Sequence, residues 1–191
     1  MPRPPSDKRE RLTAAAATLA HARGLAGATI GAIADEAGVA PGSVYYYFRT
    51  RDDIARAVVD AQHARYRDLL DRWDEDPDPR ARLVSYVDHH LGDVAMYRAH
   101  GCPVATLSLD LRREDAAMEA AAASVPTMLI GWVTAQFEAL GFAPAAARAR
   151  ATHLFTGIQG AAALTHALDD PAPLEREGAH LKRWIAQTRS A

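Results

Sequence analysis

Residues 29–48, TIGAIADEAGVAPGSVYYYF, constrain the fold more than any other stretch of the sequence. Apolar residues recur there at steps of three and four, which is the spacing of one face of a helix. Gly38 suits the left-handed conformation that ends a helix, and Pro41 suits the first turn of the next one. The stretch therefore predicts two short helices joined by a tight turn.

Five residues in this stretch have the spacing of a helix-turn-helix, namely Ile33, Ala34, Gly38, Val39 and Val44. The small side chain of Ala34 lets two helices cross closely, and the two valines can fill the angle between them. The second helix of such a motif can lie in the major groove of DNA, with its first turn at the base edges. The spacing thus favours DNA binding, although an alanine-rich chain can also match it by chance.

The rest of the chain continues the helical spacing and lacks the alternation typical of strands. We expect a helix from about residue 6 to Gly24 before the motif, and after it a longer helix, capped by Thr50, that ends near Trp73. The charged segment DEDPDPR at 74–80 then marks the clearest boundary. Beyond it the sequence predicts a short helix after residue 103 and longer ones at about 80–98, 114–140, 145–168 and 174–188.

The predicted fold class is therefore all-α, with about nine helices in total. We assign residues 1–50 to a three-helix head that contains the helix-turn-helix, and residues 51–191 to a helical body. The helix at about 51–73 is the expected connector between them.

Composition narrows the class of protein. The single cysteine, Cys102, excludes an internal disulfide framework and a CxxC metal site. No charged-then-apolar leader opens the chain, and its most apolar stretch, AAAASVPTMLIGWVTA, is interrupted by Pro126 and short for a bilayer span. We expect a soluble, cytoplasmic protein with no membrane partner.

The net charge of −2 argues at first against a nucleic-acid partner, but the charge is unevenly distributed. Residues 1–51 carry seven basic and four acidic side chains, so the remainder has a net charge of −5. A basic head on an acidic body steers one end of a molecule toward a polyanion. An ordinary solvated surface is also compatible with this imbalance.

From Thr29 onward, TIGAIADEAGVAPGSVYYYFRTRDDI resembles the DNA-binding signature of the TetR family of transcriptional repressors. The resemblance is close over residues 8–60. The body resembles that of the family in length and number of helices but carries no diagnostic motif. The resemblance implies a homodimer whose heads bind palindromic, double-stranded operator DNA. It also implies that the body binds a small-molecule inducer, whose identity the sequence does not give.

The resemblance also assigns DNA-binding residues. Thr29 would hold a phosphate at a helix N-terminus, Arg51 would pair with the DNA backbone, and Tyr47 would reach a phosphate while Phe48 packs inside the head. The positions that would meet the groove are Pro41, Gly42, Ser43, Tyr45 and Tyr46. The alternative is that the whole aromatic run belongs to the core.

The start of the reading helix departs from the family pattern. The family usually has a serine or threonine cap at the position of Ala40 and often a basic residue at that of Pro41. Both are lost here. We therefore expect base readout by the Ser43 and tyrosine hydroxyls and by apolar contact, and not by an arginine on guanine.

The helix expected at about 80–98 carries a mixed polar and aromatic stripe of Tyr86, His90, Asp93 and Tyr97, beside an apolar core stripe. A binding pocket needs this mixture of rings and a few convergent polar groups. Side chains from two later helices could close such a pocket, namely Met128, Trp132, Phe155 and Gln159. The alternative is that Trp132 and Phe155 are plain core and that His90 is exposed.

The last two helices are the predicted dimer interface. One has a face with small residues and the other a bulky stripe, and two such helices from each subunit would form a four-helix interface. The residues concerned are His153, Gly157, Gly160, Leu164, Leu181 and Trp184. Packing within one subunit is the alternative, and both faces can be in use.

These observations lead to one functional hypothesis: a ligand-responsive transcriptional repressor that is not an enzyme and needs no cofactor. No nucleophile with its base and no set of metal ligands shows the required spacing, since Cys102 and His100 alone lack further partners. An all-α enzyme, or a ligand-binding protein with a vestigial head, remains the alternative. Activation is also compatible with the sequence, because the sign of regulation depends on operator position and not on the protein.

Overall fold

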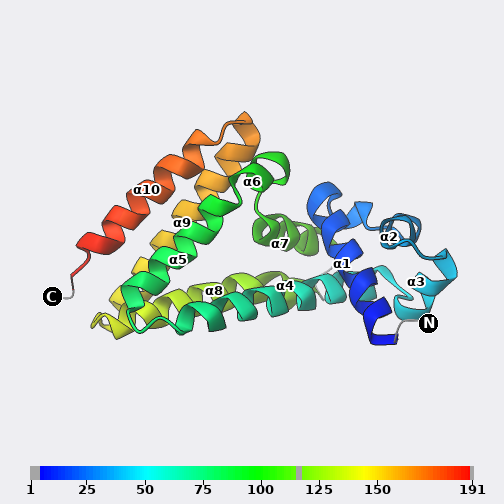
Figure 1. Cartoon of the computed structure of the whole chain (residues 1–191), viewed down its shortest axis with the longest axis horizontal. Coiled ribbons are helices and arrows are strands. Elements are labelled where there is room, and N and C mark those ends of the chain that lie inside the picture. The colour runs from blue at the N-terminus through cyan, green and yellow to red at the C-terminus, as the bar shows by residue number, and fades with distance from the viewer. Residues whose placement is uncertain (1–4, 115–117, 190–191) are drawn as a thin grey trace. The chain divides into compact units, whose positions relative to one another are not determined.

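The computed structural model describes residues 5–114 and 118–189. Within these ranges the chain is helical and contains no strand, which confirms the all-α prediction (Figure 1). The helices of the first half are α1 (Pro5–Arg23), the short 3-10 helix η1 (Leu25–Gly27), α2 (Ile30–Ala37), α3 (Pro41–Tyr47), α4 (Arg51–Asp74) and α5 (Pro79–Gly92). Those of the second half are α6 (Val94–His100), α7 (Pro103–Glu114), α8 (Glu119–Ala139), α9 (Pro144–Leu168) and α10 (Ala172–Gln187).

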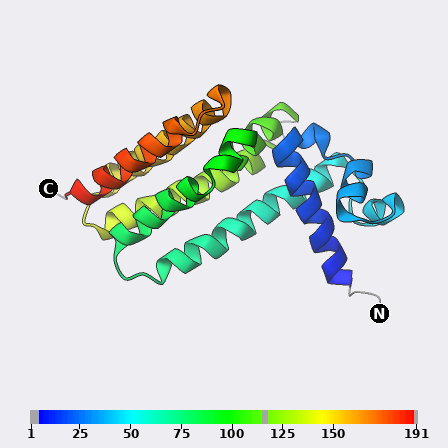
Figure 2. The same cartoon turned by 45° about the horizontal axis from the view of Figure 1, so that its top comes forward.

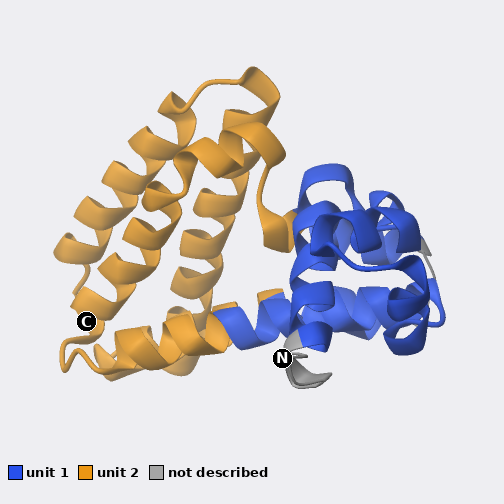
Figure 3. Cartoon of the chain, turned by 45° about the vertical axis from the view of Figure 1, so that its right-hand side comes forward, with its two compact units in different colours: residues 1–65, 106–125 blue, residues 66–105, 126–191 orange. Residues whose placement is uncertain are grey.

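The chain forms two compact units (Figure 3). The N-terminal unit comprises residues 1–65 and 106–125, and the C-terminal unit comprises residues 66–105 and 126–191. The predicted connector, α4, contributes residues to both units, and so do α7 and α8. In the C-terminal unit α9 and α10 run side by side in both views (Figures 1 and 2).

One predicted helix is divided in the structure. The sequence predicts a single helix at about 80–98, whereas α5 ends at Gly92 and α6 begins at Val94. Asp93, with φ −102° and ψ 16°, ends the first helix and precedes the second. Glycine followed by aspartate interrupts a helix readily, because both residues have low helix propensity.

The buried residues of the helix-turn-helix form part of the core of the N-terminal unit. Ile33 and Val44 are fully buried, Ala34 is nearly so, and they pack with Leu12 of α1. Leu107 and Leu111 of α7, Met118 directly before α8, and Ala122 of α8 complete this core. The Asp110 carboxylate also accepts a hydrogen bond at 2.9 Å from the backbone N–H of Leu25.

The helix boundaries around the motif have local causes. The Thr29 hydroxyl accepts a hydrogen bond from the backbone N–H of Ala32 at 3.2 Å and so caps α2. Gly38 ends that helix in the left-handed region, with φ 63°, where a glycine is unstrained. At the start of α4 the Thr50 hydroxyl accepts from the N–H of Asp53, and the Asp53 carboxylate accepts from the N–H groups of Arg49 and Thr50. This reciprocal arrangement is a capping box.

Asp53→Asn tests this cap through its pH dependence. The backbone N–H of Arg49, and then that of Thr50, hold the pKa of Asp53 below its ordinary value of 3.8. The stabilisation by the carboxylate is therefore complete above that value and is lost as the pH falls through the lowered pKa of the folded state. In urea unfolding between about pH 2 and pH 6, we expect Asp53→Asn to be less stable than the unsubstituted protein at the upper end only. A difference independent of pH would contradict the assignment.

Helix α8 is the one helix in the described ranges that is long and apolar enough to cross a membrane. This finding rests on length and composition alone, and the core helix of a soluble protein meets the same test. Leu129, Val133 and Phe137 of α8 are fully buried in the C-terminal unit, as in such a core helix.

Candidate functional site

The four aromatic residues around α3 divide into an outer and an inner set. Tyr45 and Tyr46 are 59% and 78% exposed, whereas Phe48 is only 1% exposed and packs in the core of the N-terminal unit. Tyr47 is half-buried and meets the ring of Tyr46 edge to face, with 5.0 Å between the ring centres. The aromatic run is therefore not core alone, and two large rings face outward on a helix held by Val44 and Phe48.

The start of α3 has the uncapped form that its sequence predicts. Ala40 makes no side-chain cap, and Pro41 occupies the first turn. Pro41 and Gly42 are exposed, and Ser43 is half-buried. The Ser43 hydroxyl accepts a hydrogen bond at 3.1 Å from the ammonium of Lys8, on α1. Sequence reasoning missed this contact, because 35 residues separate the partners and no local pattern joins them.

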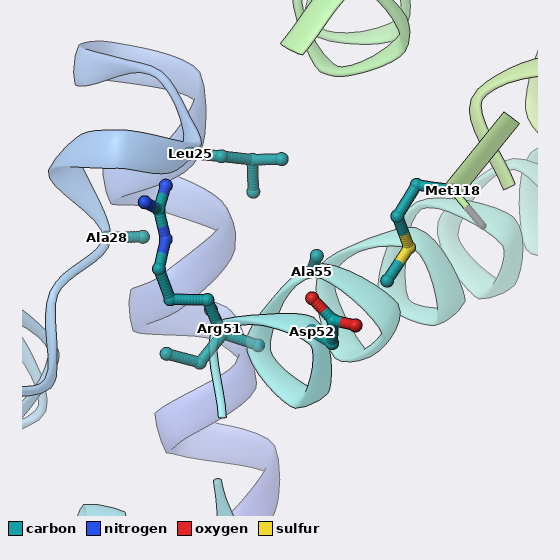
Figure 4. Close-up of a pocket in the computed structure, with 7 residues that line it drawn as sticks. Leu25, Ala28, Arg51, Asp52, Ala55 and Met118 are labelled. Atoms are coloured by element: carbon teal, nitrogen blue, oxygen red, sulfur yellow. The ribbon is translucent and has the colours of Figure 1, made fainter. Parts of the chain in front are cut away.

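Thr29 and Arg51, the predicted contacts to the DNA backbone, are both exposed in the N-terminal unit. The Thr29 hydroxyl serves as the cap of α2 and retains its own hydrogen for donation. The Arg51 side chain extends from the start of α4 toward Ala28, beside a pocket that Leu25 and Met118 also line (Figure 4). A guanidinium there can bond to a phosphate bidentately.

In the C-terminal unit Tyr86, His90 and Tyr97 of the predicted stripe are buried as a group. His90 is fully buried, so the alternative of an exposed histidine is wrong. Its Nδ1 is hydrogen-bonded to the Tyr97 hydroxyl, and its ring lies 4.8 Å from that of Tyr86, edge to face. We call these three residues, with Cys102 and Gln159, the polar core.

Gln159 and Trp132 lie at the polar core, whereas Phe155 is half-buried on α9. The Gln159 side chain bonds to the Cys102 thiol. The Trp132 ring lies 6.5 Å from that of Tyr86, and its indole N–H donates to the Asp74 carboxylate at 3.1 Å. Met128 is also half-buried, one helical turn before Trp132.

The polar core is electrically neutral around its hydroxyl and thiol groups. Burial raises the pKa of the Cys102 thiol and raises the pKa values of Tyr86 and Tyr97 well above their ordinary range. Cys102 is thus a protonated thiol at neutral pH and not a reactive thiolate. Among the described residues, no group of three or more histidine, cysteine or acidic side chains could hold a metal ion.

Two groups of the polar core have unused hydrogen-bonding capacity. The Tyr86 hydroxyl and the Gln159 amide are buried, and neither has a nitrogen or oxygen partner in the described ranges. A buried polar group without such a partner costs about 1–3 kcal/mol. A hydrogen-bond partner for either group would remove this cost.

Tyr86→Phe tests whether the Tyr86 hydroxyl is buried without a hydrogen-bond partner. Because the Tyr86 hydroxyl has no hydrogen-bond partner in the described part of the chain, its removal is expected to leave the free energy of unfolding unchanged or to raise it by up to about 1 kcal/mol. Tyr97→Phe is the matched control, which is expected to lower it by about 1–2 kcal/mol because His90 loses its hydrogen bond. Urea unfolding measures both, and equal destabilisation by the two substitutions would contradict the assignment.

The predicted interface residues fall into three groups in the C-terminal unit. Leu181 is fully buried within the unit, and a side chain at Gly157 would meet Glu177 of α10 at 2.7 Å, so both positions serve packing inside one chain. Trp184 is half-buried against His153, with 5.0 Å between their ring centres. The remaining predicted residues, Gly160 and Leu164, are exposed, and so is Leu168, which sequence reasoning missed.

Comparison with known proteins agrees with this geometry. Residues 12–58, which contain the helix-turn-helix, match the family described as bacterial regulatory proteins, tetR family. Residues 85–180, half of the chain, match the C-terminal domain of LmrA/YxaF-like transcriptional regulators. The chain belongs to the TetR family. This family consists of transcriptional regulators and not of enzymes.

Curated TetR relatives align with part of the chain. The chain is 32% identical over 104 residues to the HTH-type transcriptional repressor KstR2 of Mycobacterium tuberculosis. The aligned region covers 49% of this chain and 50% of that protein. The chain is 31% identical over 111 residues to an uncharacterized HTH-type regulator of Lactococcus lactis, with 56% of each chain covered. The chain thus spans about half the length of the curated relatives it matches.

Solved TetR structures share the fold along almost the whole chain. A TetR regulator from Legionella pneumophila superposes with a TM-score of 0.84 at 18% identity and 100% coverage of both chains. The reduced form of NemR from E. coli superposes with a TM-score of 0.76 at 24% identity, covering 93% of this chain and 96% of NemR. Identities this low show the common fold alone.

Proposed function

We propose that this TetR regulator is a cytoplasmic, ligand-responsive repressor. In this proposal a homodimer binds palindromic operator DNA and a small-molecule inducer releases it. The observation that carries the proposal is the pair of exposed rings, Tyr45 and Tyr46, on a helix whose inner face is fixed by Val44. Two adjacent exposed rings form a patch, and exposed apolar patches mark interaction sites whereas single exposed apolar residues are ordinary.

The chemistry of α3 fits the floor of a major groove. Tyrosine and serine hydroxyls can both donate to and accept from base edges, and an aromatic ring can contact a thymine methyl group. Thr29 and Arg51 flank the helix in the N-terminal unit and would fix its register on the phosphates. Tyr47, half-buried beside Tyr46, would bring a further hydroxyl to the backbone.

A homodimer is proposed because a palindrome needs two reading helices related by a two-fold axis. The exposed face of α9 supports it, since Leu164 and Leu168 are 54% and 63% exposed beside the open position of Gly160. A second copy of this face would bury both leucines. His153 of α9 and Trp184 of α10 would lie at its edge.

Inducer binding is proposed at the polar core. The Tyr86 hydroxyl, which has no hydrogen-bond partner in the described ranges, and the Gln159 amide, whose contact is the Cys102 thiol, support it. Trp132 and the half-buried Met128 and Phe155 are the further lining residues. An inducer releases the operator only if it binds the released conformation more tightly than the DNA-bound one. Repression, rather than activation, is proposed because the similar KstR2 is named a transcriptional repressor.

A gel-shift titration against the DNA that flanks its own gene tests the proposal. We expect a discrete shifted band that weakens steeply with salt, since phosphate contacts release counterions. Small molecules from an organic cell extract are then added to the complex, and at least one fraction is expected to release the DNA. Binding without site preference, or without salt dependence, would contradict operator recognition.

A further inference from the structure

The reading helix α3 lacks a cation of its own. No lysine or arginine occurs between Ala40 and Phe48, and the helix begins without a side-chain cap. Neutralisation of phosphates supplies much of the affinity of DNA-binding proteins. A reading helix of this composition therefore depends on cations that other elements bring to it.

Lys8 brings such a cation to α3 from α1. Its ammonium donates to the Ser43 hydroxyl oxygen at 3.1 Å. The position of Lys8 is set by the packing of α1, because Leu12, four residues later, is fully buried. Arg11, three residues after Lys8, donates to the backbone carbonyl of Ala37 at the end of α2. Residues three and four apart share a helix face, so the same face of α1 supports both helices of the motif.

The Lys8 bond determines what the Ser43 hydroxyl can do. A hydroxyl has one hydrogen to donate and two acceptor positions, whereas an ammonium can only donate. Lys8 therefore occupies an acceptor position of Ser43 and leaves the hydroxyl hydrogen for another acceptor. The neighbouring positive charge also polarises the hydroxyl and strengthens its donation. The major groove offers acceptors at guanine O6 and N7, adenine N7 and thymine O4.

We infer that Lys8 is a DNA-contacting and specificity-determining residue of this regulator. Its ammonium neutralises a phosphate beside the start of α3, and its bond to Ser43 turns that hydroxyl into a donor to a base acceptor. The inference deepens the proposed function and rests on operator binding. It separates two roles that can be measured independently, since the charge governs the salt dependence of affinity and the bond governs base preference.

Fluorescence anisotropy on a duplex that the unsubstituted protein selects from a random pool tests both roles. The variants are Lys8→Met, Ser43→Ala and the double substitution, and Arg9→Met is the matched control because Arg9 is an exposed cation next along α1. Lys8→Met is expected to weaken binding about tenfold and to reduce the slope of log affinity against log salt by about one. Arg9→Met is expected to lose at most about threefold.

Base preference gives the second readout. On duplexes with single base changes, Ser43→Ala is expected to relax the preference at one position in the unsubstituted background. In the Lys8→Met background, Ser43→Ala is expected to change the base preference at that position less than threefold, since Lys8 no longer orients the Ser43 hydroxyl. Circular dichroism is expected to show the same helix content for all variants.

Either of two results would overturn the inference while operator binding stands. The first is that Lys8→Met and Arg9→Met weaken DNA binding by the same factor. The second is that Ser43→Ala changes base preference by the same factor in the unsubstituted and in the Lys8→Met background. If the unsubstituted protein selects no sequence from the pool, the proposed function fails and the inference fails with it.

Discussion

Replacing Tyr45 and Tyr46 together with alanine is expected to weaken operator binding about 100-fold, because each base-edge contact contributes about 1–3 kcal/mol. The free energy of unfolding is expected to change by no more than about 0.5 kcal/mol. The two rings are 59% and 78% exposed, so their removal leaves no cavity. Anisotropy titration on the selected operator and urea unfolding on the same preparation measure the two effects.

Leu109→Ala is the matched control for this double substitution. Leu109 lies on α7 in the N-terminal unit and is 55% exposed, so it has the same apolar character and exposure outside the reading helix. It is expected to leave both affinity and stability unchanged. Intact operator binding after loss of both tyrosines, or an equal loss on Leu109→Ala, would contradict the assignment of α3 as the reading helix.

Phe48→Ala is expected to lower the free energy of unfolding of the N-terminal unit by about 3–5 kcal/mol, the usual cost of truncating a buried phenylalanine. Phe48 is 1% exposed and packs with Val44 and Ile33 in the core of that unit. DNA binding is expected to be lost as a consequence of unfolding and not through a missing contact. Urea unfolding followed by circular dichroism measures the loss.

Phe48→Leu separates the two causes, because it keeps most of the buried volume. It is expected to retain operator binding and most of the stability. Unchanged stability on Phe48→Ala would show that this side chain is not part of the core. Tyr46 and Phe48 are expected to respond in opposite ways, because Tyr46 is exposed on α3 whereas Phe48, the residue directly after α3, is buried in the core.

The parts of the fold that depend on local interactions could be predicted from the sequence. Thr29, Gly38 and Thr50 act within three or four residues of their own positions, so their types alone indicate where α2 and α4 begin and where α2 ends. The division of the aromatic run also follows locally, since helical spacing separates Val44 and Phe48 from Tyr45 and Tyr46.

Contacts between residues distant in the sequence could not be predicted in the same way. The bond from Leu25 to Asp110 joins residues 85 apart, and it belongs to the packing of α7 in the N-terminal unit. No pattern in either segment points to the other. The bond from Lys8 to Ser43 escaped prediction for the same reason.

An apolar stripe on a helix also does not show whether the surface that covers it belongs to the same chain or to another chain. The spacing of Leu181 on α10 indicates that its face is covered, and the structure shows that the cover comes from the same chain. The exposed Leu164 on α9 has equal hydrophobicity and a different environment. Burial in one chain and burial between two chains give the same sequence pattern, because both respond to the removal of apolar surface from water.

Ethylation and methylation interference on the selected operator tests the central claim most directly, namely that α3 reads DNA sequence in the major groove as part of a dimer. The account predicts two clusters of interfering positions, related by a two-fold axis, with major-groove contacts centred about 34–36 Å apart or a multiple of that spacing. Phosphates flanking each cluster are expected to interfere as well. Interference confined to phosphates, or to the minor groove, would contradict the account.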